Sequence, residues 1–306
     1  MTNTKATTTK ISHRYLTALL TALAATILAL SAFSVPAIGE QSDDPHQSAS
    51  GASKKDAAVP LSSATATTAR ASFASGSAEN FLGVKVSNHG NLMSFESPQG
   101  QEQVFSGQEG YAVCSNFSST VHGHDTGSVE GGFGAPAFSQ PTAGEFPLTV
   151  TRKTTDGKFQ LKQVWNKPDA TEKDITVTMT LKNLSSATVH NVFLSRSGDF
   201  DAGATSQNQG ARTLDSAWQW NDQSTESASR PPAGVMLTAA TFGAVQDTFV
   251  EPRSDWAGGT HENCFARVPA LTTPTSVQDL AMRAHYALFS LSAGQSKTVK
   301  FEYRSM

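Results

Sequence analysis

Two short clusters in the chain combine side chains that bind metal ions. His122, a glycine, His124 and Asp125 follow one another, and on an extended segment alternate residues point the same way, so both imidazoles would face one side with Asp125 as an oxygen ligand. Asp199 and Asp201, one residue apart, offer two carboxylates of the kind that Ca²⁺ takes. Each cluster has a simpler interpretation, a glycine-rich loop for the first and an aspartate-stabilised turn for the second. We favour the simpler interpretations and expect no cofactor, with Zn²⁺ or Ca²⁺ as the alternative.

Aromatic side chains supply a second kind of candidate site. Trp218 and Trp220 stand two residues apart, so on a strand both indoles face one side. Exposed, they would form a platform on which sugar rings stack, with Asn221 and Asp222 as hydrogen-bonding neighbours; buried, they would be core residues. Trp256 lies in a glycine-rich stretch and is the third candidate for carbohydrate binding.

The two cysteines, Cys114 and Cys264, are the only ones in the chain. In an exported protein two cysteines most simply form one disulfide. Two buried thiols are the alternative. A catalytic thiol is the least favoured interpretation, because no signature of a cysteine enzyme surrounds the pair.

A histidine near the start of the domain admits two interpretations. Asn88-His89-Gly90-Asn91 resembles the Asn-His segment of aldose epimerases, in which the histidine protonates a ring oxygen and a glutamate acts as base. The glycine and asparagine after His89 are equally typical of a tight hairpin turn, and the turn is the interpretation that we prefer.

The elements that must position these residues are strands. Three threonines alternate with the apolar residues Ile175, Val177, Met179 and Leu181. This period of two indicates a strand with one solvent-exposed face. The same alternation occurs around residues 159–165 and 297–303. An Asp-Gly pair at 156–157, between two such runs, predicts a β-hairpin because glycine accepts positive φ.

The whole pattern predicts about ten to thirteen strands and no convincing helix. We expect an all-β fold, a large sandwich of two antiparallel sheets, since each sheet then buries its apolar face against the other. Residues 80–306 would form this domain. The preceding residues, 40–79, are rich in Ser, Ala and Thr and read as a disordered linker.

Several segments carry a resemblance on top of this pattern. VKVSNHGNLMSFESP, LTVTRKTTDGKFQLKQ, LSRSGDFDAG and the closing SAGQSKTVKFEY resemble segments of a group of secreted bacterial β-sandwich proteins of unknown function. The resemblance implies a supersandwich of the type found in galactose mutarotases and carbohydrate-processing enzymes. It implies no activity, because fold does not carry function.

The N-terminal residues, 1–39, predict an export signal. Lys5, Lys10 and Arg14 precede an apolar run that closes on small residues at 35–39, the order typical of a secretory signal peptide; a retained membrane anchor is the alternative. Removal of these three basic residues lowers the formal charge from −3 to about −6. That acidity argues against nucleic acid or an anionic membrane as partner.

Together these patterns predict an extracellular or periplasmic binding or surface-associated module without enzymatic activity. Its expected partner is a polysaccharide or another cell-surface component. The alternative is a carbohydrate-active enzyme of the glycosidase or epimerase type on the same fold, with Asp199 and Asp201 as acid and base.

Overall fold

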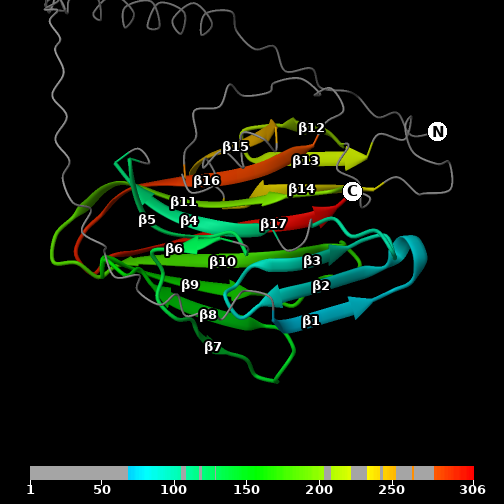
Figure 1. The fold of residues 1–306 in the computed structure, drawn as a ribbon, viewed down its shortest axis with the longest axis horizontal. Coiled ribbons are helices and arrows are strands. Elements are labelled where there is room, and N and C mark those ends of the chain that lie inside the picture. The colour runs from blue at the N-terminus through cyan, green and yellow to red at the C-terminus, as the bar shows by residue number, and fades with distance from the viewer. Residues whose placement is uncertain are drawn as a thin grey trace, which may run out of the picture. The chain divides into compact units, whose positions relative to one another are not determined.

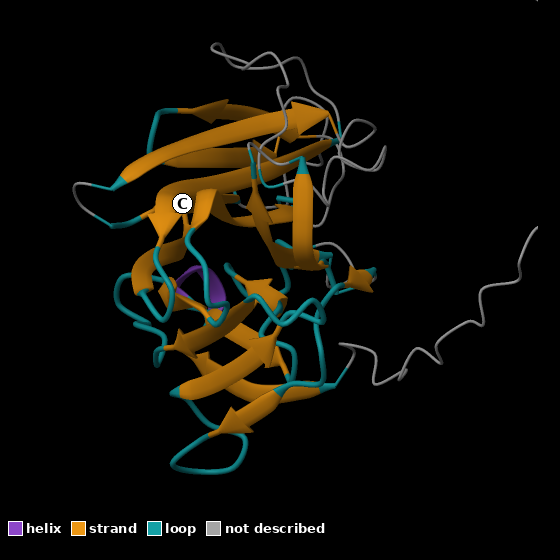
Figure 2. Ribbon diagram, turned by 90° about the vertical axis from the view of Figure 1, so that its left-hand side faces the viewer, coloured by secondary structure: helices purple, strands orange, loops and turns teal. Residues whose placement is uncertain are grey.

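The computed structural model describes residues 68–104, 108–116, 119–127, 129–202, 208–221, 233–241, 244–252, 264 and 279–306. Within these residues the chain forms seventeen strands and one short 3₁₀ turn, η1 (Ala78–Asn80), and Figure 2 shows how far strands dominate. None of the described helices is long and apolar enough to cross a bilayer. The strands are β1 (Ala69–Ser75), β2 (Leu82–Ser87), β3 (Leu92–Glu96), β4 (Glu109–Ser115), β5 (Thr120–Asp125), β6 (Glu130–Gly131), β7 (Ala137–Ser139), β8 (Leu148–Lys153), β9 (Phe159–Trp165), β10 (Asp174–Asn183), β11 (Val189–Asp199), β12 (Asn208–Arg212), β13 (Ser216–Asn221), β14 (Gly234–Ala239), β15 (Val245–Pro252), β16 (Leu280–Leu291) and β17 (Ser296–Ser305).

Three antiparallel sheets contain these strands (Figure 1). The largest has eight strands in the order β12-β13-β14-β17-β10-β9-β8-β7, the second has six in the order β15-β16-β11-β4-β5-β6, and the third consists of β1-β2-β3. The chain crosses between the two large sheets after β6, β10, β11, β14 and β16. The all-β sandwich expected from the sequence is therefore confirmed, with a small third sheet added to the two large ones.

The alternation read from the sequence sets which faces pack together. In β10 the four apolar residues from Ile175 to Leu181 are buried, while the threonines between them are half-buried. The predicted Asp-Gly turn joins the antiparallel strands β8 and β9, and Gly157 has φ of +73°. One apolar cluster takes side chains from all three sheets, among them Phe95, Leu194 and Phe301. The sheets therefore bury their apolar faces against one another.

The second face of the six-stranded sheet is also covered. Ala112, Cys114 and Phe193 form a separate buried cluster there with Cys264, because residues next to one another on a strand point to opposite sides. Cys114 and Cys264 are joined by a disulfide, with their Cα atoms 5.7 Å apart. The disulfide expected from the sequence is therefore confirmed.

One boundary differs from the expectation. β1 lies inside the stretch that composition assigned to a disordered linker, yet it pairs with β2 from Ala69 to Ser75 and buries Ala71. The folded part thus includes residues before Asn80, because backbone pairing with β2 orders a segment that has few large apolar side chains. The predicted export signal and the linker up to residue 67 lie outside the described residues.

Candidate functional site

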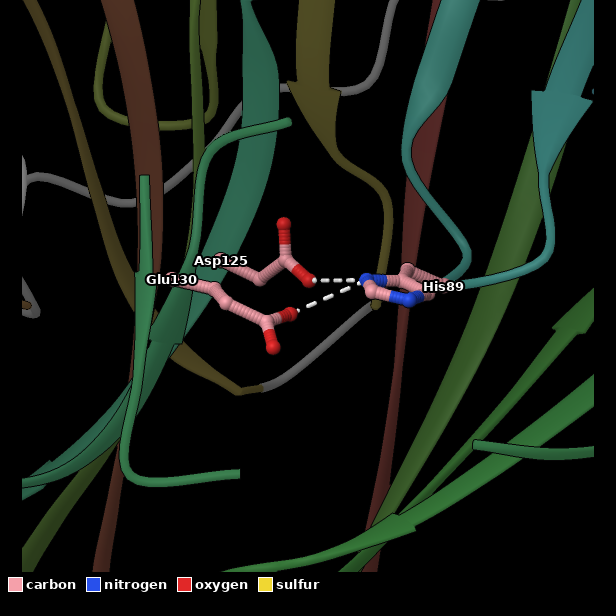
Figure 3. Close-up of side chains that lie close together, drawn as sticks. All are labelled: His89, Asp125 and Glu130. Atoms are coloured by element: carbon pink, nitrogen blue, oxygen red, sulfur yellow. Dashed lines mark hydrogen bonds and ion pairs between the residues drawn. The ribbon is translucent and has the colours of Figure 1, made fainter. Parts of the chain in front are cut away.

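A group of four charged side chains, three of them buried, lies where the three sheets meet. His89 is in the turn between β2 and β3, Asp125 ends β5, Glu130 begins β6 and Arg152 is on β8. His89 Nδ1 lies 2.9 Å from Asp125 Oδ2 and 3.0 Å from Glu130 Oε2 (Figure 3). Arg152 donates to the same two oxygens, over 2.5 Å to Asp125 and 3.1 Å to Glu130. Two basic groups thus face two carboxylates.

Electrostatics keeps His89, Asp125 and Arg152 charged near neutral pH. Hydrogen bonds to Asp125 and Glu130 raise the pKa of His89 to about 9, against the opposing effect of burial. Burial alone would raise the pKa of Asp125, but the hydrogen bond from His89 and the charge of Arg152 hold it below its usual range. A metal ion at these carboxylates would have to displace both cations. These four residues, which we call the His89 cluster, therefore already contain the positive charges that balance the two carboxylates.

A second buried group lies beside it. Arg196 on β11 makes two hydrogen bonds to Glu109 on β4, at 2.8 and 2.7 Å, and a third, of 2.7 Å, to Gln163 on β9. The hydroxyl of Tyr303 contacts both Arg196 and Glu109, and the Arg196 guanidinium lies 4.7 Å from the centre of the Trp165 ring. This arrangement connects the two large sheets through groups that are fully paired.

The two buried groups are joined and have a structural role. The carbonyls of His89 and Gly90, in the β2–β3 turn, accept hydrogen bonds from Tyr111 and Arg196 respectively. His89, Asp125 and Arg152 are each at most 3 % exposed. His89 Nδ1 and the Arg152 guanidinium both pair with Asp125, and all three side chains are shielded from solvent, so these contacts connect the small sheet to the two large ones.

The predicted H-x-H cluster does not converge. Strand β5 has an irregularity at His122, because Cys114 pairs with Val121 and Val113 pairs with Gly123. His122 contacts Ser115 and Asp156, whereas His124 lies against Gly131 on β6. Asp125 is engaged with His89. The structure thus places the three expected ligands in three different environments.

The predicted pair of aspartates does come together, and a third joins it. Asp199 ends β11, Asp201 follows it, and Asp279 precedes β16; one carboxylate oxygen from each lies within 4.8 Å of those of the other two. Asp199 and Asp201 are buried. Such a set has the oxygen chemistry that Ca²⁺ takes. The sequence analysis missed Asp279 because it lies far along the chain.

The two tryptophans of β13 lie on the outer face of the eight-stranded sheet. Ala217, Gln219 and Asn221 alternate with them and are buried, whereas Trp218 and Trp220 are half-buried. Neither indole belongs to the core, unlike Trp165, which is fully buried. Trp218 and Trp220 are therefore outside the buried apolar cluster, and each is partly exposed.

Polar and apolar neighbours of the two tryptophans continue this outer surface across the sheet. Trp218 pairs with Met236 on β14, which pairs in turn with Arg304 on β17, and directly opposed residues share one side of a sheet. Trp220 pairs with Gln209 on β12 and donates a 3.0 Å hydrogen bond to it from Nε1. All five side chains are half-buried. We call these five residues the tryptophan face.

Three other candidate residues contribute less to this surface. Asn221 is buried and its side-chain oxygen accepts the backbone N–H of Ala233 over 3.0 Å, so that oxygen is already engaged. Asp222 and Trp256 lie outside the described residues. Arg304 and Gln209 are the polar neighbours that the sequence analysis missed, because strand order across a sheet is not visible in local sequence.

The fold has counterparts among solved structures. No protein-family model matches the chain, and no curated protein matches its sequence. A bacterial glucoamylase complexed with acarbose is similar in structure, with a TM-score of 0.53 and 9 % identity, over 79 % of this chain and 32 % of the glucoamylase. The chain thus spans about a third of the length of that enzyme.

Two further structures are similar at lower scores. A polysaccharide lyase has a TM-score of 0.37 and 9 % identity, over 78 % of this chain and 32 % of the lyase. A copper-containing benzylamine oxidase from Hansenula polymorpha has a TM-score of 0.39 and 7 % identity, over 74 % of this chain and 58 % of the oxidase. Of these three structures, the glucoamylase has the TM-score above 0.5, and it shows that this β-rich arrangement also occurs in a bacterial glucoamylase.

Proposed function

We propose that this protein is an exported module that binds carbohydrate on the tryptophan face of its eight-stranded sheet. The observation that carries the proposal is the placement of Trp218 and Trp220 side by side on the solvent side of β13. Indole rings give a large apolar surface with one polar edge. The apolar faces of sugar rings can stack on such a surface while their hydroxyls remain hydrogen-bonded.

The neighbours of the tryptophans fit this role. Gln209 and Arg304 supply an amide and a guanidinium beside the indoles. Arg304 is 38 % exposed in its side chain and is paired with Asp174 at 3.3 Å and Glu302 at 3.0 Å. This edge of the tryptophan face therefore carries charges of both signs, which favours a neutral polysaccharide over a strongly acidic one.

Export is part of the proposal and has one structural support. The Cys114–Cys264 disulfide is of a kind that persists in oxidising compartments outside the cytoplasm. N-terminal sequencing of the protein from the culture medium or periplasm tests the predicted signal peptide. The expected first residue lies between Ile38 and Gln41.

The alternative, a carbohydrate-cleaving or epimerising enzyme, has weaker support. Such an enzyme needs an acid and a base that reach the sugar. The His89 cluster contains an imidazole and two carboxylates, but Asp125 and His89 are buried and paired with one another, and Arg152 also donates to Asp125. No observation favours this site over the tryptophan face.

Affinity electrophoresis tests the proposal directly. The purified protein is run in native gels that contain soluble starch, xylan or a mixed-linkage β-glucan, and at least one polysaccharide should retard it. Trp218→Ala and Trp220→Ala should each lower the affinity at least ~10-fold, equivalent to ~1.4 kcal/mol. Phe289→Ala, which removes an exposed aromatic ring from the other large sheet, is the matched control and should bind normally.

Two results would contradict the proposal. One is that none of the polysaccharides retards the wild-type protein. The other is that a polysaccharide retards it and both tryptophan variants bind as well as the wild type, since binding would then lie elsewhere on the molecule.

A further inference from the structure

Three polar side chains at one end of the sandwich are connected in series. Ser115 ends β4, His122 lies at the irregularity in β5, and Asp156 is in the turn between β8 and β9. Ser115 Oγ lies 2.8 Å from His122 Nε2, and His122 Nδ1 lies 2.6 Å from Asp156 Oδ2. A hydroxyl, an imidazole and a carboxylate linked in this order through the two ring nitrogens are the arrangement that activates serine nucleophiles.

The carboxylate of Asp156 sets the direction of both hydrogen bonds, the one between Asp156 and His122 and the one between His122 and Ser115. Burial raises the pKa of Asp156, but hydrogen bonds from Thr154, His122 and the backbone N–H of Lys158 outweigh it and hold the pKa below its usual range. The ionised carboxylate can only accept, so His122 Nδ1 carries the proton that it receives. In the neutral imidazole Nε2 is then an acceptor, and the hydroxyl of Ser115 donates to it. This is the tautomer that a general base requires.

Packing and hydrogen bonds fix His122 and Asp156 in place. The His122 ring meets the Phe159 ring edge-on, with centroids 4.8 Å apart. Asp156 Oδ1 accepts from Thr154 Oγ1 at 2.6 Å and from the Lys158 N–H at 3.0 Å. The Asp156 side chain is 35 % exposed and that of His122 only 1 %. The carboxylate thus lies at the surface, and the imidazole lies behind it in an apolar setting.

We infer that Ser115, His122 and Asp156 form a nucleophilic triad that hydrolyses small acyl esters. This goes beyond carbohydrate binding, because the three residues lie on β4, β5 and the β8–β9 turn and the tryptophan face lies on β12, β13, β14 and β17. It also differs from the expectation of a module without enzymatic activity. Ser115 is only 2 % exposed, so we expect the triad to accept small acyl groups alone.

The reaction balances with water as the only co-substrate. Ser115 Oγ forms a bond to the ester carbonyl carbon while its proton moves to His122 Nε2, and collapse of the tetrahedral adduct breaks the bond to the alcohol oxygen, which takes that proton. Water then attacks the acylated serine and gives a proton to His122. The acid leaves, and Ser115 Oγ regains its proton. Asp156 orients His122 and stabilises its charged form throughout.

Covalent labelling is the first test. The folded protein is treated with a fluorophosphonate, and the labelled peptide is identified by mass spectrometry; the expected site is Ser115. Asp156→Asn should lower the labelling rate at least ~100-fold, because it replaces the acceptor-only carboxylate that sets the tautomer with an amide that can also donate, and the same change costs about 10⁴-fold in a serine protease. Asp169→Asn is the matched control, since Asp169 also accepts turn hydrogen bonds, from Thr171, without a histidine partner.

Ester hydrolysis is the second test and separates catalysis from a structural role. Wild type should hydrolyse p-nitrophenyl acetate, and Ser115→Ala should abolish this activity while the Asp169→Asn control retains it. Melting temperatures of all variants show whether they are folded. The inference is overturned if a folded wild-type protein is not labelled at Ser115, or if folded Ser115→Ala hydrolyses the ester as fast as wild type.

Discussion

Raising the pH through the titration of His89 should weaken the fold by a measurable amount. The pKa of His89 is about 9 in the folded protein, against 6.5 for an unperturbed histidine. A group whose pKa is raised by folding adds stability below its unfolded pKa and loses that contribution as the pH rises to its folded pKa. Each pH unit between the two values corresponds to ~1.4 kcal/mol. The free energy of unfolding should therefore fall by about 3 kcal/mol between pH 6 and pH 9.5.

Urea unfolding at a series of pH values measures this effect. His89→Gln removes the titrating group but keeps a hydrogen-bond donor near Asp125 and Glu130, and Asp125 keeps its pair with Arg152. The variant should be less stable than wild type by about 3 kcal/mol at pH 6 and nearly equal to it at pH 9.5. His190→Gln, at an exposed histidine whose ring contacts Ser290, should keep the pH dependence of wild type. If wild type and His89→Gln lose the same stability over this range, the assignment of a charged, buried His89 is incorrect.

Three further predictions concern other buried groups. The cysteines of the Cys114–Cys264 disulfide are 150 residues apart, and reduction of this disulfide should lower the melting temperature. Cys114→Ser and Cys264→Ser should reduce the unfolding free energy by equal amounts, up to ~5 kcal/mol. Unequal losses would show a second role for one cysteine. Glu109→Gln leaves the fully buried Arg196 without its carboxylate and should reduce the unfolding free energy by about 3–5 kcal/mol, as urea unfolding will show, whereas a loss below ~1 kcal/mol would mean that solvent reaches the pair. Burial lowers the pKa of His285 to about 4, so stability should fall as the pH drops from 6.5 to 4, and His285→Phe should remove that dependence in acid unfolding curves.

Strands β10 and β17 were predictable because one face of each is buried and the other is partly exposed. Alternation of apolar and polar residues in β10 and β17 follows directly from packing on one side, and the structure buries Ile175, Val177 and Phe301 accordingly. The Asp-Gly turn at Gly157 was predictable because a positive φ requires glycine there. Strand β1 was not predictable from the sequence, because its small side chains give no periodic signal and its order depends on pairing with β2.

The candidate sites were less accessible to sequence reasoning. An extra residue at His122 breaks the two-residue period of β5, so the inference that His122 and His124 point together failed. Arg152 and Arg196 do leave a trace in the sequence, since each stands at an inward position of a strand otherwise occupied by apolar residues, as at Val150 and Leu194. Their carboxylate partners come from other strands, and only the three-dimensional arrangement identifies them.

Residue-resolved oxidation of the tryptophans tests the central claim, carbohydrate binding on the tryptophan face, most directly. The protein is treated with N-bromosuccinimide with and without a polysaccharide that retards it, and oxidation of each tryptophan is read by peptide mass spectrometry. Trp218 and Trp220 should oxidise faster than the fully buried Trp165, and bound polysaccharide should slow both. Oxidation of Trp218 and Trp220 that is unchanged by bound polysaccharide would contradict the account.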